Sequence, residues 1–286
     1  MNYVVIGEVE IYSVSDGKLR FPKNEFFADL EESDWKPYKD YAKETIDLNV
    51  GSFIIKTKSK NILVDTGLGK LDHGILQLEK ENLISDMSKS GFSVQDIDIV
   101  FMTHLHLDHV GTNMTLTKEG WKPTFPNAKY FVSNKDWKLF SKLINTENFK
   151  YIKEQVNPLI ELNLLDKFDE EISLTKEVTT FPTPGHTPGH TSLLISSKNE
   201  KAIITGDAIH IPIQSGNIHW SPSPDRDKKL SAKSRDKLIS YIEKEQALIA
   251  AGHFAFPGFG KIIKVNSKRI YFPITCLLYT SDAADE

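Results

Sequence analysis

Cysteine is almost absent from this chain of 286 residues, which has only Cys276. No disulfide can form within the chain, and no metal site can use a pair of cysteine ligands. The tail 276–286 begins at this cysteine and resembles the translation of a sequencing adapter, so it is not expected to belong to the fold. The remaining residues 1–275 are expected to form a single domain.

The sequence also lacks long apolar runs and any concentration of positive charge. The longest apolar stretches, such as 97–102, are far shorter than the roughly 18 residues that span a bilayer. The amino-terminal residues show no basic region followed by an apolar export segment. The formal net charge is -4, with lysine and arginine scattered along the chain, which argues against a nucleic-acid partner. We therefore expect a cytoplasmic protein that binds neither nucleic acid nor membranes.

Segments rich in β-branched and aromatic residues alternate with segments of helical spacing. The expected strands are 50–57, 61–64, 97–102, 130–133, 191–196 and 201–205. The expected helices are 74–90, 135–145 and 231–245. Because both kinds of element are spread over the whole chain, we expect an α/β fold.

Two long regions show no clear period. Aromatic and charged residues are interleaved in 19–48, and three prolines lie within 212–227. Irregular connections of this length either cover a functional site or lie loosely on the surface. The first region is thus a candidate cap segment.

The most informative segment is 104–109, with the sequence His-Leu-His-Leu-Asp-His, directly after the expected strand 97–102. Histidines two residues apart in extended backbone point to the same side. Asp108 and His109 follow where the chain turns towards a helix. Crowded imidazoles lose solvation and repel one another when charged, unless a cation binds them. The run therefore predicts a two-metal hydrolytic site rather than a group of surface histidines.

Further donors lie where other apolar segments begin or end. His186 and His190 occur in a turn rich in proline and glycine, just before an expected strand. Asp207 follows the expected strand 201–205, and His253 follows another apolar stretch. Rigid strands that hold ligands at one edge of a sheet would give these side chains a common site.

Five motifs in this order resemble the metallo-β-lactamase superfamily. They are Leu-Val-Asp-Thr-Gly at 63–67, the histidine run, Gly-His-Thr-Pro-Gly-His, Thr-Gly-Asp-Ala and the late Gly-His. The resemblance spans residue 50 to about residue 263. It implies an αββα sandwich, in which two mixed β-sheets face each other, helices lie outside, and metals bind at one edge.

The same resemblance implies a ligand set of seven residues. His104, His106 and His190 would hold the first metal, Asp108, His109 and His253 the second, and Asp207 would bridge them. Asp65 and His186 match positions that are not primary ligands. Both would hold ligands through hydrogen bonds, although His186 is equally well explained as a structural residue of its turn.

The expected cofactors are two divalent metal ions. Nitrogen and oxygen ligands suit Zn²⁺, the favoured identity, but manganese, iron and cobalt accept the same set. Two divalent ions, two carboxylates and a bridging hydroxide leave about one positive charge for a developing oxyanion. We expect this hydroxide to attack a carbonyl or phosphoryl centre.

The branch of the family is indicated by the residues around Asp207. True β-lactamases of this superfamily commonly have a cysteine at that position. The stretches 206–210, 225–227 and 250–260, together with Arg235, resemble the acyl-homoserine lactonase and methyl parathion hydrolase branch. The favoured function is a quorum-quenching lactonase that opens N-acyl-homoserine lactones. The alternative is an aryl ester or organophosphate triester hydrolase.

Asp108 and His210 are the candidate catalytic residues. Many lactonases of this branch have a tyrosine three residues after the bridging aspartate, where this chain has His210. A histidine can donate a hydrogen bond to an oxyanion. The other interpretation of His210 is a packed residue without a catalytic role.

The expected partner is a small-molecule substrate with an apolar acyl or aryl group. Aromatic residues of 21–41, with Phe254, Phe256 and Phe259, either line its pocket or simply pack in the core. Apolar residues in the amino-terminal region are also compatible with a homodimer.

Three other functions remain open at this stage. A glyoxalase II-like thiolesterase uses similar metal motifs, and a persulfide dioxygenase uses a similar cluster to bind one iron. The third is a ligand-binding relative without activity, which the complete donor set disfavours. Metal analysis separates the hydrolases from the dioxygenase, since two zinc-like ions per chain favour hydrolysis and a single iron with oxygen uptake favours the dioxygenase.

Overall fold

A computed structural model describes residues 2–38, 41, 43–70, 76–79 and 82–274. Its first sheet contains β1 (Tyr3–Ile6), β2 (Val9–Pro22), β3 (Thr45–Lys56), β4 (Asn61–Val64), β5 (Leu76–Glu79), β6 (Ile99–Phe101), β9 (Lys129–Ser133) and β10 (Leu165–Phe168). The order is β1-β2-β3-β4-β6-β9-β10, and β5 pairs with β2. The sheet is mixed, because the pairs from β4 to β10 are parallel and the others antiparallel.

The second sheet is also mixed. It contains β11 (Val178–Pro182), β12 (Thr191–Ser197), β13 (Glu200–Ile204), β14 (Leu248–Ala250), β15 (Phe259–Val265) and β16 (Lys268–Pro273), in that order. Only β13 and β14 run parallel among these neighbours. A small separate hairpin is formed by β7 (Met114–Thr117) and β8 (Gly120–Pro123).

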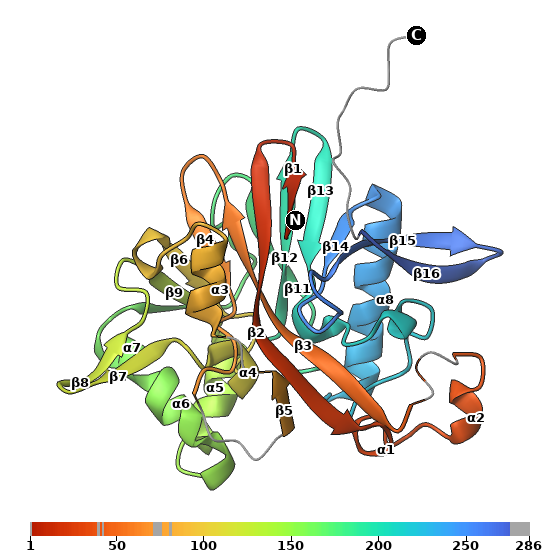
Figure 1. The fold of residues 1–286 in the computed structure, drawn as a ribbon, viewed down its shortest axis with the longest axis horizontal. Coiled ribbons are helices and arrows are strands. Elements are labelled where there is room, and N and C mark those ends of the chain that lie inside the picture. Colours follow the sequence, from red (N-terminus) through yellow and green to blue (C-terminus); the bar gives the residue numbers. More distant parts are fainter. Residues whose placement is uncertain (1, 39–40, 42, 71–75, 80–81, 275–286) are drawn as a thin grey trace.

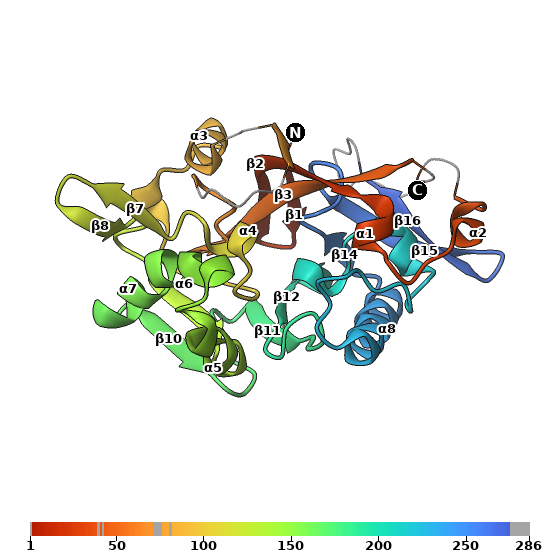
Figure 2. The same cartoon turned by 90° about the horizontal axis from the view of Figure 1, so that it is seen from below.

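The α-helices of the described residues are α1 (Lys23–Phe26), α2 (Glu32–Trp35), α3 (Leu83–Lys89), α4 (Leu107–Val110), α5 (Asn134–Leu143), α6 (Lys150–Gln155), α7 (Asn157–Glu161) and α8 (Lys228–Glu245). Figures 1 and 2 show α3 and α5 to α7 on one side of the molecule and α8 on the other. In the described part of the chain, no helix is long and apolar enough to cross a membrane.

The alternation of side chains along β3 explains the layers. Phe53 and Ile55 belong to the apolar cluster between the two sheets, which also contains Leu193 and Ile204 from the second sheet. Ile54 points the other way and packs with residues of the helical layer. Successive side chains of a strand face opposite sides, so a strand covered on both faces is apolar throughout. The αββα arrangement predicted from the motifs is confirmed.

The helix expected at 74–90 is only partly present. Its described residues form the strand β5 and the shorter helix α3, while 74–75 and 80–81 lie outside the described residues. β5 is held by pairing with β2, where Leu19 lies opposite Gln77. The other two expected helices are found as α5 and α8. α8 begins earlier than expected because the Asp227 side chain accepts a hydrogen bond from Leu230 N, which caps the helix.

The described residues of the candidate cap segment 19–48 include a packed aromatic cluster. Phe26, Phe27 and Trp35 lie in one apolar cluster with Ile211 and Ile213. The Trp35 ring also lies 4.9 Å from the ring of Trp220. The two irregular regions of the sequence therefore pack against each other.

Candidate metal centre

The candidate ligands follow the carboxyl ends of neighbouring strands. β4 and β6 are parallel and end side by side, and so do β13 and β14 in the other sheet. A hydrogen bond from Thr191 N to Thr103 O joins the two sheets at this edge. Loops that leave these strand ends therefore converge from both sheets, as the sequence motifs predicted.

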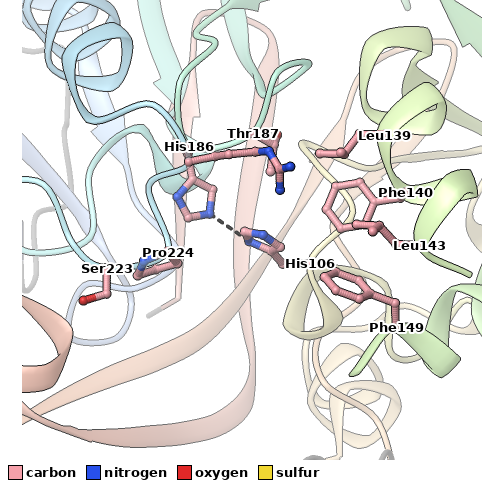
Figure 3. A pocket seen from close by; sticks show the side chains of 10 residues that line it. His106, Leu139, Phe140, Leu143, Phe149, His186, Thr187, Ser223 and Pro224 are labelled. Carbon is pink, nitrogen blue, oxygen red and sulfur yellow. Dashed lines mark hydrogen bonds between the residues drawn. The ribbon is translucent and has the colours of Figure 1, made fainter. Parts of the chain in front are cut away.

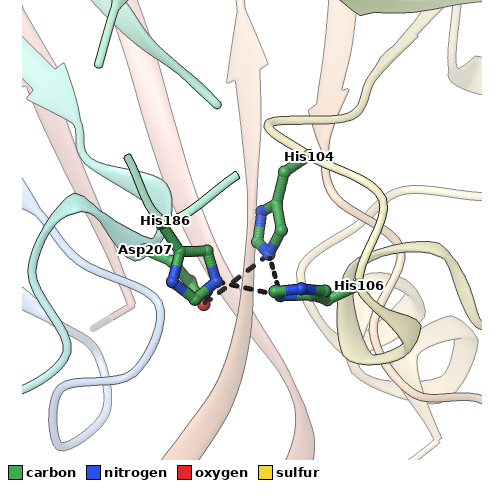
Figure 4. Close-up of side chains that lie close together, drawn as sticks. All are labelled: His104, His106, His186 and Asp207. Atoms are coloured by element: carbon green, nitrogen blue, oxygen red, sulfur yellow. Dashed lines mark hydrogen bonds and ion pairs between the residues drawn. The ribbon is translucent and has the colours of Figure 1, made fainter. Parts of the chain in front are cut away.

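One group of donors contains His104, His106, His186 and Asp207, whose ligand atoms all lie within 4.8 Å of one another. His106 Nδ1 lies 3.0 Å from His104 Nε2 and 2.9 Å from His186 Nε2. Oδ2 of Asp207 lies 3.2 Å from His186 Nε2 and 3.7 Å from His104 Nε2. Figure 4 shows the four side chains pointing towards one another.

A second group contains Asp108, His109 and His253. Oδ2 of Asp108 lies 3.6 Å from His109 Nε2 and 3.7 Å from His253 Nε2. The same two nitrogens lie 3.3 and 3.1 Å from Oδ1 of Asp207. Oδ1 of Asp207 thus faces the second group, while Oδ2 faces the first group and also lies 3.2 Å from His253 Nε2. A carboxylate that lies between two donor groups has the position expected of a bridging ligand.

His190 differs from its expected place. Its Nε2 accepts a hydrogen bond of 2.8 Å from Asp207 N, and its Nδ1 bonds to Thr183 Oγ1 at 2.8 Å. Both ring nitrogens of His190 thus have hydrogen-bond partners already, and His190 does not belong to either donor group. The close fit depends on Gly206, where φ is +50° and a Cβ would lie 2.6 Å from His190 Nε2. His186, four residues earlier in the same turn, lies in the first donor group instead.

Three histidines of the donor groups form hydrogen bonds to oxygen atoms through Nδ1, the ring nitrogen that lies away from the other donors. Nδ1 of His109 lies 2.8 Å from Oδ2 of Asp65, which also accepts from Thr103 Oγ1. Nδ1 of His253 donates to Asn49 O at 2.9 Å, and Nδ1 of His186 donates to Asp225 Oδ1 at 2.8 Å. Each bond fixes a proton on Nδ1 and leaves Nε2 free to bind a cation.

The histidines of the site differ in the direction of their pKa shifts. The pKa values of His104 and His106 are lowered, whereas those of His109, His186 and His253 are raised. Burial, reinforced by neighbouring histidines, holds the pKa of His104 and of His106 well below the usual range. For Asp207 burial opposes ionisation, but the surrounding histidines hold its pKa well below the usual range. For His186 burial favours the neutral form, yet Asp207 and Asp225 raise its pKa to about 9. A cation at this site would replace that proton.

The donor set fits divalent metal ions. Imidazole nitrogens with carboxylate oxygens suit zinc and related transition metals. The buried Nε2 of His109 has no hydrogen-bond partner among the described residues. A buried polar atom without a partner destabilises the folded state, and a bound ligand such as a metal ion removes that cost. The prediction that the chain binds divalent metal ions is supported by this chemistry.

A cavity of about 230 Å³ opens beside the first donor group. Figure 3 shows His106 and His186 on its wall, facing apolar side chains of α5 and of the turn that follows. These apolar residues are Leu139, Phe140, Leu143 and Phe149. The sequence analysis missed them, although the spacing of 139, 140 and 143 is that of one helix face.

The aromatic residues expected to line a pocket lie elsewhere. Phe254 and Phe259 pack in the two apolar clusters of the second sheet, and Phe256 is exposed. Phe26, Phe27 and Trp35 pack within the cap segment. None of these residues lines the described cavity. The packing interpretation fits most of them, but Phe256 is exposed and the ring of Phe26 also lies 5.7 Å from the ring of His210.

A comparison with family models matches residues 46–253 to the metallo-beta-lactamase superfamily. The chain belongs to this superfamily. The matched segment includes both donor groups and most of the two sheets, so the family and the fold predicted from the motifs are confirmed.

Relatives and structures within the superfamily point to lactonases. An N-acyl homoserine lactonase from Bacillus sp. is 25% identical over 226 residues, which cover 73% of this chain and 83% of that protein. N-acyl homoserine lactonase AttM from Rhizobium radiobacter is 28% identical over 186 residues, covering 62% of this chain and 65% of that protein.

Two solved structures share the fold over nearly the whole chain. AidC, a dizinc quorum-quenching lactonase in complex with the product N-hexnoyl-L-homoserine, has a TM-score of 0.79 and 27% identity. It covers 96% of this chain and 97% of its own. The hydrolase AbOPH has a TM-score of 0.83 and 24% identity over the same shares, which shows the fold alone. This metallo-β-lactamase superfamily chain is therefore a hydrolase, as predicted.

Proposed function

We propose that this chain is a dinuclear metal-dependent lactonase that opens N-acyl-homoserine lactones and so quenches quorum signals. The observation that carries the proposal is the pair of donor groups that share Asp207 beside an apolar cavity. The lactonase relatives and the product-bound neighbour AidC support the choice of substrate.

The proposed ligand set follows the geometry of the donor groups. His104, His106 and His186 hold the first cation, Asp108, His109 and His253 hold the second, and Asp207 lies between them. His186 takes the place that the motif comparison gave to His190. We propose two Zn²⁺ ions, because all the donors are nitrogen or oxygen.

When bound, the two cations would supply Lewis-acid chemistry, which polarises the scissile carbonyl and lowers the pKa of a water molecule towards neutrality. Side chains of the protein carry out the proton transfer and stabilise the developing negative charge. Asp108 is less buried than Asp207, so we assign it the transfer of a proton from the attacking water to the leaving oxygen. His210 donates a hydrogen bond to the carbonyl oxygen as negative charge develops there.

The apolar wall of the cavity is assigned to the acyl chain of the substrate. Its volume of about 230 Å³ lies below the roughly 300–1,000 Å³ of pockets that hold drug-sized ligands. We therefore propose a short acyl chain. Arg226, Ser223 and Thr187 line other parts of the cavity and can bond the amide of the substrate.

Aryl ester or phosphotriester hydrolysis is the second candidate. The rings of Phe140 and Phe149 lie 5.8 Å apart with an interplanar angle of 66°. Such a pair forms an aromatic wall that can pack against an aryl leaving group. This candidate uses the same cations and differs only in the group that occupies the cavity.

A substrate panel on metal-analysed protein tests the proposal. It compares homoserine lactones of several chain lengths with an aryl ester, an aryl phosphotriester and a glutathione thiolester. We expect two divalent ions per chain and the highest kcat/KM on short-chain lactones. The exposed His219 provides the control variant His219→Ala, whereas Asp207→Asn is expected to be inactive.

Three results would contradict the proposal. Inactivity on lactones and esters alike would overturn it, and a preference for the phosphotriester would select the second candidate. A single iron with oxygen consumption would instead indicate a persulfide dioxygenase.

A further inference from the structure

A buried ion pair lies directly behind the first donor group. Arg235, on the inner face of α8, is fully buried, and its Nη2 lies 3.2 Å from Oδ2 of Asp225. The side chains of both residues have no exposed surface. Isolated buried charges are strongly destabilising, so each member of this pair requires the other.

Asp225 connects this pair to His186. Its Oδ1 accepts a hydrogen bond of 2.8 Å from His186 Nδ1, and its Oδ2 also accepts one of 2.7 Å from Ser231 Oγ. An ionised carboxylate can only accept, so the proton of the neutral imidazole must lie on Nδ1. The Nε2 lone pair then points to the donor group, 3.2 Å from Asp207 Oδ2.

Arg235 connects the same pair to the loop that carries Asp207. Its Nε donates to Ala208 O at 2.8 Å. Its Nη1 donates to Ile218 O at 2.6 Å and to Trp220 O at 3.1 Å. A guanidinium presents its donors in a fixed planar fork, so these bonds set the position of the loop relative to α8. One buried side chain thus contacts the loop that carries Asp207 directly and reaches His186 through Asp225.

We propose that the Asp225–Arg235 pair is a positioning unit that sets the cation affinity of the first donor group. Asp225 fixes the tautomer of His186, and Arg235 fixes both Asp225 and the loop after Asp207. Neither residue touches the cations or the substrate. The inference rests on the proposed function, because it requires His186 to hold a cation.

Charge-neutral variants separate positioning from folding. Asp225→Asn keeps the shape, but its amide can donate to His186 Nδ1 and move the imidazole proton to Nε2. Arg235→Gln keeps hydrogen-bond donors and removes the charge. The double variant Asp225→Asn/Arg235→Gln leaves no unpaired buried charge. Asp236→Asn is the control, since Asp236 also lies on α8 but pairs with Arg269 at a half-exposed site.

The measurements are Zn²⁺ affinity by chelator competition, the absorption spectrum of the Co²⁺-loaded protein, and urea unfolding of the metal-free protein. We expect Asp225→Asn to weaken the binding of one Zn²⁺ by about 10- to 100-fold and to change the Co²⁺ spectrum. The double variant is expected to recover the stability lost in each single variant, but not the affinity. The control should match the wild type in all three measurements.

The outcomes distinguish this inference from the proposed function. Wild-type protein that binds no cation would overturn both. Wild-type protein with two cations, and Asp225→Asn with equal affinity and an equal spectrum, would overturn only the positioning role. A double variant that recovers affinity together with stability would show that the pair acts through folding alone.

Discussion

Nε2 of His210 lies 3.2 Å from Oδ2 of Asp207, and neither ring nitrogen of His210 has a hydrogen-bond partner among the described residues. The His210 ring stacks on His253 at 5.5 Å, and the edge of Phe26 lies 5.7 Å away. Burial lowers the pKa of His210 to about 4, so its imidazole is neutral at neutral pH. A neutral imidazole held beside both donor groups keeps one N–H for a substrate oxygen.

Replacement of His210 by phenylalanine tests this role. His210→Phe keeps the ring packing and removes the donor, so we expect kcat on the lactone to fall by about 10²–10³-fold. Metal content should not change, because His210 is not in the proposed ligand set. The exposed His219 gives the control His219→Phe. Unchanged lactone turnover in His210→Phe would refute the role.

The choice between His186 and His190 is tested by a matched pair of variants. His186→Gln should weaken the binding of one cation by about 100-fold or more, beyond the range for residues that only support a ligand. His190→Gln should retain two cations, because glutamine can still accept from Asp207 N. Metal analysis after dialysis against a chelator measures both. The reverse pattern would restore the ligand set implied by the motifs.

The apolar wall of the cavity predicts a change in chain-length preference. Leu143→Ala removes contacts to the end of a chain, so kcat/KM for a hexanoyl lactone should fall by about tenfold. The value for a butanoyl lactone should change little. Leu162→Ala, at an exposed position outside the cavity, is the control. Equal losses for both substrates would place the acyl chain elsewhere.

We expect Asp16 to make a pH-dependent contribution to the stability of the folded protein. Burial raises its pKa to about 6, although backbone amides of Gly69, Leu83 and Leu68 oppose the shift. The folded chain therefore holds this proton more tightly than the unfolded chain, where the pKa is about 3.9. The stabilisation is complete below about pH 4 and is lost as the pH rises through about 6. A shift of about two units corresponds to about 3 kcal/mol.

The measurement is urea unfolding of wild type and Asp16→Asn between about pH 4 and about pH 7. The amide of the variant cannot titrate, so the stability of the wild type relative to the variant should decrease over this range. A difference that does not depend on pH would contradict the raised pKa.

Unfolding of a Trp35 variant tests whether residues 1–275 behave as one domain. Trp35 is almost fully buried against Phe27 and Trp220, so Trp35→Ala should cost about 3–5 kcal/mol. Because the cap segment packs on residues 211–220, we expect the single unfolding transition to shift as a whole. Trp121→Ala, at a partly exposed position, is the control. A separate early transition would show that the cap folds independently.

Much of the site could be predicted from local sequence. The run from His104 to His109 predicted a metal site because crowded imidazoles are unfavourable without a cation. The strands 61–64 and 201–205 were predicted because a buried strand needs a continuous apolar segment. Their carboxyl ends carry Asp65 and Asp207, so the edge that holds the donors followed from sequence order, whereas the αββα sandwich followed from the resemblance to the superfamily.

Tertiary structure decided the rest. Residues 76–79 form a strand because β2 offers a pairing edge, and a local sequence period does not record such a partner. His186 and His190 lie in one turn with similar neighbours, so spacing alone could not choose between them. The path of the turn places them differently: the Asp207 amide donates to His190 Nε2, and His186 Nε2 faces Asp207 Oδ2. Which nitrogens converge depends on backbone direction and packing across distant segments, whereas residue type and order are properties of the sequence itself.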